Sequence, residues 1–264
     1  MSAFLQGFSI FLLIFCRITA FFVVAPVFSS RGVPNMFKLG LGFFISLFVF
    51  MTYGFNQDIV MNAEYVLAVI REILIGILLG FIVYMFFTVV QTAGAFMDMQ
   101  IGFAMANVVD PHTGVSAPLL GNFKYMLMLV VFLMMNGHHY LLTGLMDSYQ
   151  WMPLSNELFS RMMSGSISDF LVRVFGNTFL LAFQVAAPLV VALFLTDVAL
   201  GFLTKTAPQF NVFVIGIPIK IIVGLFLLAL LVPGLAVIFG KLFSIMFESL
   251  EQLFGIVQGP PEGQ

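Results

Sequence analysis

The chain has 264 residues, of which 61% are hydrophobic and only 8% are charged, and its formal net charge is −2. Soluble domains are typically about 45–50% apolar and about 25% charged, so this composition excludes an ordinary soluble enzyme and a disordered chain. It also lacks the basic excess that a nucleic-acid-binding protein needs. The sequence therefore predicts a protein that lies in a bilayer or in an assembly that replaces one.

Six apolar segments are long enough to cross the hydrocarbon core of a membrane, which takes about 20 helical residues. They cover residues 3–28, 39–55, 66–97, 125–145, 171–195 and 212–239. If the segments alternate across the membrane, each side has four cations in its loops, so the positive-inside rule favours neither orientation. These cations are Arg31, Lys38, Lys124 and Lys205 on one side and Arg71, Arg161, Arg173 and Lys241 on the other. Residues 241–258 have the polar spacing of an amphipathic helix.

Enzymatic chemistry has no support in the sequence, and we expect no cofactor and no metal. The chain has no GxxxxGK[ST] phosphate loop and no GxGxxG sequence, so we expect that it does not hydrolyse ATP itself. The three histidines are not spaced as metal ligands, and Ser116 is not in a GxSxG sequence.

Polar groups inside apolar helices are expensive, so each of them requires a partner. Arg17 lies in the middle of the first segment, and its candidate partners are Glu72, Asp98 and Asp197. A structural ion pair is the favoured interpretation, and an ion or substrate path is the alternative.

Small residues recur at helical spacing beside these charges, and they allow two helices to approach closely. Three sets share a helix face: Gly94, Asp98, Gly102 and Ala106; Asp197, Gly201 and Lys205; and Gly216, Lys220 and Gly224. Gly76 and Gly80 form a GxxxG pair in the third segment. We predict assembly roles, not catalysis, for Asp98 and for the Asp197/Lys205 pair.

Residues 108–118 form an irregular segment between two apolar flanks. Asp110-Pro111, Gly114 and Pro118 prevent a regular helix there. Irregular backbone at membrane depth is tolerated only where protein covers it or where it lines a water-filled cavity. A pore constriction and an ordinary surface loop are both compatible with this pattern. Pro188, Pro208 and Pro218 are expected to break later segments near polar residues, as in transporter substrate sites.

Ordered blocks over nearly the whole chain resemble the FliR family of flagellar biosynthetic proteins, with its virulence relatives SpaR, YscT and SctT. The early blocks are Arg17, Pro26 and Pro34; Gly94-x-x-x-Asp98-x-Gln100-x-Gly102-Phe103; Asp110-Pro111-x-x-Gly114 with Pro118; and Asn136-Gly137-His138. The later block is Ala187-Pro188, Asp197, Leu200-Gly201, Ala207-Pro208-Gln209-Phe210-Asn211-Val212-Phe213, Gly216, Pro218 and Lys220. Two positions depart from the family pattern, because Arg is usual at Lys205 and Met is common at Phe210.

The resemblance implies an all-α membrane protein whose six segments, several of them broken, form hairpins within a helical hetero-oligomeric channel. It implies one domain over residues 1–264, with a FliP-like part at about 1–170, a FliQ-like part at about 171–245, and an amphipathic end and disordered tail at 246–264. It further implies a flagellar type III export gate in the bacterial cytoplasmic membrane and basal body. There the chain would contact lipid, FliP-like and FliQ-like subunits, FlhB-like and FlhA-like proteins, and exported unfolded polypeptides.

The resemblance indicates a channel plug, and the residue patterns described above give the other candidate residues. A channel plug would comprise Met105, Val108, Val109, Asp110, Pro111, Gly114, Val115, Pro118 and Leu119. The buried-charge or assembly candidates are Arg17, Asp98, Gln100, Asp197, Lys205 and Lys220, and the helix-packing candidates are Gly76, Gly80, Gly94, Gly102, Gly201, Gly216 and Pro218. The alternative to an export gate is a small-molecule secondary transporter, in which Arg17, Asp98 and Lys220 line a site at the midplane of the membrane.

Overall fold

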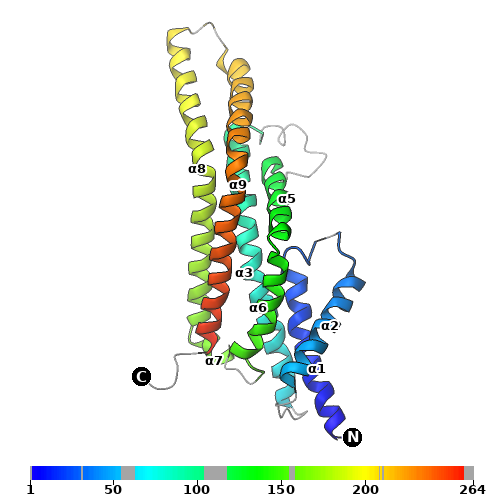
Figure 1. Ribbon diagram of the computed structural model, residues 1–264. Coiled ribbons are helices and arrows are strands. Elements are labelled where there is room, and N and C mark those ends of the chain that lie inside the picture. The colour runs from blue at the N-terminus through cyan, green and yellow to red at the C-terminus, as the bar shows by residue number, and fades with distance from the viewer. Residues whose placement is uncertain are drawn as a thin grey trace. The chain divides into compact units, whose positions relative to one another are not determined.

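The structure is a computed structural model that describes residues 2–30, 32–54, 63–103, 118–154, 158–207, 209 and 211–258. Over these residues the chain forms helices and no strand (Figure 1). The helices are α1 (Ser2–Val24), α2 (Asn35–Tyr53), α3 (Ala63–Ile101), α5 (Leu119–Met134), α6 (Gly137–Trp151), α7 (Leu158–Met163), α8 (Ser166–Thr206) and α9 (Val212–Gln258).

The prediction of an all-α membrane protein is confirmed. Five of the described helices are long and apolar enough to cross a membrane, and the number rises to six if the bent pair α5 and α6 is one span. The fourth predicted segment is this bent pair, in which the helix axes differ by 71° at a short break. Asn136 at the break has a φ of 57°, a left-handed conformation that asparagine tolerates better than most residues.

Three helices are much longer than the apolar segments that predicted them. α3 has 39 residues, α8 has 41 and α9 has 47, and α9 unites the sixth apolar segment with the amphipathic stretch at 241–258. The expectation that prolines break these helices is wrong for Pro188 in α8 and for Pro218 in α9. A proline removes one backbone hydrogen bond, and the bonds of the neighbouring turns continue the helix on both sides.

The chain divides into two compact units. Unit 1 comprises residues 1–85, 135–175 and 244–264, and unit 2 comprises residues 86–134 and 176–243, so α3, α8 and α9 each contribute to both. In unit 1 the core includes Leu13, Ile18, Phe21, Phe22 and Ile75. In unit 2, the Phe132 ring lies 5.3 Å from the Phe87 ring and 4.9 Å from the Phe243 ring, centroid to centroid.

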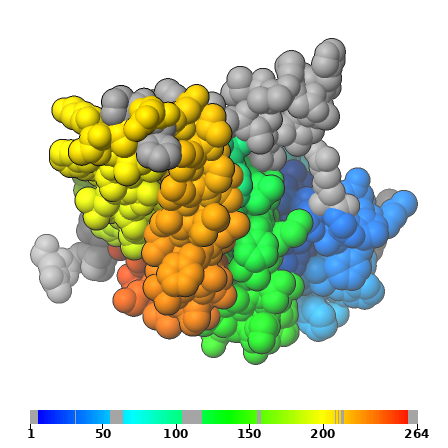
Figure 2. Space-filling model, turned by 90° about the horizontal axis from the view of Figure 1, so that it is seen from above, coloured from blue at the N-terminus to red at the C-terminus, as the bar shows by residue number. Residues whose placement is uncertain are grey.

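Within unit 2, α8 and α9 form a helical hairpin. Its yellow and orange parts lie side by side in both views (Figures 1 and 2). Ala182, Ala186, Leu189 and Leu193 of α8 are almost completely buried, and their spacing of three or four residues gives α8 one narrow buried stripe. Most of the remaining α8 surface is exposed and apolar.

Candidate functional site

The first polar cluster, in unit 1, surrounds the completely buried guanidinium of Arg17 on α1. Its Nε donates to Oε2 of Glu72 at 2.6 Å, and its Nη1 donates to Oγ of Ser148 at 3.1 Å. Its Nη2 donates to the carbonyl oxygen of Met152 at 2.8 Å. The guanidinium carbon also lies 4.0 Å from the centre of the Tyr149 ring. Among the three candidate partners, Glu72 forms the ion pair with Arg17.

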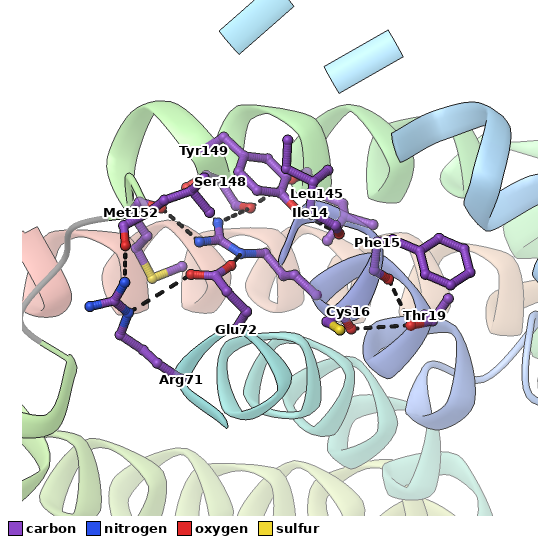
Figure 3. Close-up of polar contacts among 12 residues, drawn as sticks. Ile14, Phe15, Cys16, Thr19, Arg71, Glu72, Leu145, Ser148, Tyr149 and Met152 are labelled. Atoms are coloured by element: carbon purple, nitrogen blue, oxygen red, sulfur yellow. Dashed lines mark hydrogen bonds and ion pairs between the residues drawn. The ribbon is translucent and has the colours of Figure 1, made fainter. Parts of the chain in front are cut away.

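This Arg17 cluster joins three helices of unit 1. Figure 3 shows Arg71 and Glu72 on α3, facing Ser148, Tyr149 and Met152 at the end of α6. The carbonyl oxygens at a helix C-terminus carry partial negative charge, so they favour a buried cation. Arg71 also donates to the carbonyl oxygen of Leu154. The Arg17 guanidinium, which donates to Glu72, Ser148 and Met152, has the geometry of a structural ion pair.

The second cluster, in unit 2, is the α3–α5 junction. Both carboxylate oxygens of Asp98 accept from the backbone N–H of Leu120, at 3.2 and 3.1 Å. Asp98 thus lies at the N-terminus of α5, where the helix dipole favours an anion. Two turns earlier in α3, Gln91 Nε2 donates to Asn122 Oδ1 at 3.3 Å.

The two backbones meet at glycines in this junction. A Cβ on Gly94 would lie 2.2 Å from the Cα of Gly121, and a Cβ on Gly121 would lie 2.7 Å from the carbonyl oxygen of Gln91. No side chain fits at either position without a shift of the helices. The packing is therefore set by the absence of side chains at two facing positions.

Lys124 is a buried cation of this junction that the sequence reasoning missed. The alternation of apolar segments predicts a loop position for Lys124, but it lies in α5 with 1% of its surface exposed. Its Nζ is 2.7 Å from Sδ of Met97, and it is attracted electrostatically to Asp98. The available signal was its spacing of three residues from Gly121, which puts both on one helix face.

The third cluster, also in unit 2, pairs Asp197 of α8 with Lys220 of α9. Lys220 Nζ lies 2.9 Å from Oδ1 of Asp197, and Gln100 Nε2 donates to Oδ2 at 3.0 Å. Asp197 and Lys205, for which we predict assembly roles, do not contact each other in the described part of the chain, and Lys205 is exposed. Eight residues of continuous helix separate these two by about 12 Å, whereas α9 brings Lys220 alongside.

The glycine candidates differ in their surroundings. A Cβ on Gly76 would lie 2.2 Å from the Arg17 carbonyl oxygen, and one on Gly80 would lie 2.9 Å from Cβ of Val24, so both lie where α3 packs closely on α1. Gly102 follows the end of α3 with a φ of +103°, so it does not continue the face of Gly94 and Asp98. Nothing lies within 4 Å of a Cβ built on Gly201.

The other candidates are placed as follows. Gly216 is buried and Pro218 is exposed, both within α9. Leu119 begins α5 and is exposed, and Pro118 precedes it. Outside the described residues lie Met105, Val108, Val109, Asp110, Pro111, Gly114 and Val115. Among the described residues, no three or more His, Cys, Asp or Glu side chains are grouped to hold a metal ion.

Comparisons with a family model and with known proteins all indicate the same family. Residues 8–246 match the family model described as bacterial export proteins, family 1. The chain is 38% identical over 257 residues to the flagellar biosynthetic protein FliR of Bacillus subtilis (strain 168), covering 97% of this chain and 99% of that protein. It is 34% identical to FliR of Escherichia coli (strain K12), and this match covers 90% of this chain and 89% of that protein. It is 29% identical to the Yop proteins translocation protein T of Yersinia pestis, and this match covers 81% of this chain and 82% of that protein.

Each of these matches covers at least 81% of this chain and at least 82% of the relative. They agree with the long apolar helices and with the ordered residue blocks. The chain belongs to the FliR family of bacterial export proteins, and it is a membrane-embedded component of a flagellar or related type III export apparatus and not an enzyme.

Proposed function

We propose that the chain is a subunit of the flagellar type III export gate, where it forms a channel with FliP-like and FliQ-like subunits. FlhB-like and FlhA-like proteins complete the apparatus in the cytoplasmic membrane at the flagellar basal body, and unfolded flagellar subunits pass through the channel. We further propose that residues 1–170 act as a FliP-like part and 171–245 as a FliQ-like part.

The length of α9, together with its exposed apolar surface, carries this proposal. Its 47 residues measure about 70 Å at 1.5 Å per residue, more than twice the hydrocarbon thickness of about 30 Å. A helix tilted by the usual maximum of about 40° uses only about 26 residues to cross that core. About 20 residues of α9 therefore extend beyond the lipid.

Much of the apolar surface of α8 and α9 is not covered by the chain itself. Only 17% of the most apolar stretch of α9 is buried within the chain, and the corresponding share for α8 is 28%. The exposed apolar side chains of α8 run from Val172 to Leu203, about 48 Å along the helix, which is longer than the hydrocarbon core is thick. Exposed apolar surface outside lipid is typical of protein–protein interfaces. Neighbouring subunits are therefore the natural cover for these two helices.

Purification of the chain with its candidate partners tests the proposal. We expect the full-length chain, expressed together with the FliP-like and FliQ-like proteins of its own organism, to purify in mild detergent as one hetero-oligomer. A chain that instead purifies alone, as a symmetric homo-oligomer that binds a small solute, would support the secondary-transporter alternative.

We also propose that Asp110–Pro118 contributes to a plug of this channel, with apolar seals at Met105, Val108, Val109, Val115 and Leu119. Flexible apolar side chains can fit around a passing polypeptide and still limit ion leak. Deletion of residues 108–117 should raise the leak of ions through membranes that contain the complex. Unchanged leak in a complex that still assembles would contradict the plug.

A further inference from the structure

A cavity of about 460 Å³ lies in unit 1, between α6 and the C-terminal turns of α9. We call it the α6–α9 groove; its two helices are the green α6 and the red end of α9 in Figure 1. Its walls include the aromatic rings of Tyr140, Trp151, Phe247 and Phe254 and the carboxylates of Asp147 and Glu251.

The aromatic walls are preformed and accessible. The Tyr140 and Phe247 rings meet edge to face, with centroids 5.9 Å apart. The exposed fractions of Tyr140 and Trp151 are 64% and 47%. Aromatic faces attract cations, and they also provide apolar surface for an aliphatic stem.

The charge of the groove has one sign. Asp147 comes from α6 and Glu251 from α9, and the described residues that line the cavity include no lysine, arginine or histidine. Within the described part of the chain, neither carboxylate takes part in an ion pair. Two carboxylates from two helices, set among aromatic rings, are complementary to a cation with an apolar body.

We propose that the α6–α9 groove binds a lysine side chain of another protein subunit of the export apparatus; this rests on the proposed function. An ammonium has three donors that rotate freely, so it can contact carboxylates on two separate helices. The rigid fork of a guanidinium fits one carboxylate better than two separated ones. The four-carbon stem of lysine would lie against Trp151 and Phe254.

Zero-length carbodiimide crosslinking of the intact complex tests this proposal, because it joins a carboxylate to a primary amine in direct contact. We expect Asp147 or Glu251 to be linked to one lysine of another subunit, identified by mass spectrometry. In the Glu251→Gln variant, Asp147 should still be linked to the same lysine. Trp151→Ala leaves both carboxylates in place and should lower the crosslink yield by about tenfold, because the aromatic wall is lost.

Asp169 provides the matched control, since it is an exposed carboxylate of the same unit that does not line the groove. A link from Asp147 or Glu251 to the amine of phosphatidylethanolamine would overturn the proposal in favour of a lipid site. A complex that purifies intact but gives no adduct at either residue, or the same lysine on Asp169, would also overturn it. Failure of the complex to assemble would instead count against the proposed function.

Discussion

Arg17 is a cation whose removal leaves a buried anion behind. In Arg17→Met, the Glu72 carboxylate would remain buried without its ion-pair partner. Such a change destabilises a protein by about 3–5 kcal/mol, so we expect a large fall in the thermal unfolding midpoint of the purified chain. Adding Glu72→Gln should recover part of the loss. Lys205→Met, at an exposed cation, should change the midpoint little, and an equal loss there would contradict this account.

Asp98 has two separable roles, as a hydrogen-bond acceptor for α5 and as a negative charge near Lys124. Asp98→Ala removes both, and Asp98→Asn keeps an acceptor and removes the charge. We expect the Ala variant to lose about 1–2 kcal/mol from the cap alone, and the Asn variant to lose less. Hydrogen exchange at the Leu120 amide should accelerate in the order wild type, Asn, Ala. Equal protection in all three would show that Asp98 does not cap α5.

At the residue scale, the sequence predicted which charges are unusual better than it predicted their partners. Arg17 and Asp98 stood out because an apolar segment surrounds each of them. Glu72 is one of three candidates for Arg17, and the sequence singles out no partner for Asp197, which the structure pairs with Lys220. Partner choice depends on which helices pack together, and a single sequence does not contain that information.

Between elements, two glycine contacts fix how closely helices approach. Gly94→Ala would place a methyl group against the backbone of Gly121, and overpacking of this kind costs about 1–3 kcal/mol. Gly176→Ala, in α8, meets nothing within 4 Å and should stabilise the helix by about 0.5–1 kcal/mol. Thermal unfolding of the two variants should therefore shift in opposite directions. A shift in the same direction for both would contradict the close crossing of α3 and α5.

Element boundaries were the weakest part of the sequence-based prediction. Apolar runs indicate where each helix lies, and prolines such as Pro188 are expected to break them near polar residues such as Lys220. In the structure these residues are paired or accommodated inside continuous helices. A hydropathy pattern reports which side chains suit lipid, and helices of this length extend beyond it.

For the whole molecule, the exposed apolar faces of α8 and α9 predict a difference between the isolated chain and its complex. Cysteines at Phe194 and Phe226, in a chain with Cys16→Ala, should react with a small maleimide in membranes that lack the partner subunits. Co-expression of the FliP-like and FliQ-like proteins should protect at least one of the two positions. A cysteine at the buried Leu193 should be unreactive in both cases. Unchanged labelling at positions 194 and 226 would contradict cover by those subunits.

The Arg17 cluster also sets an order of events during synthesis. Arg17 is separated by 55 residues from Glu72, by 131 from Ser148 and by 135 from Met152. At about 5–20 residues per second, α6 emerges from the ribosome about 7–26 s after α1. During that interval Glu72 is the first of these partners available to Arg17. The nascent chain therefore carries the Arg17 cation in an apolar helix without its α6 partners until α6 is synthesised. This makes membrane insertion the step most sensitive to the loss of Glu72.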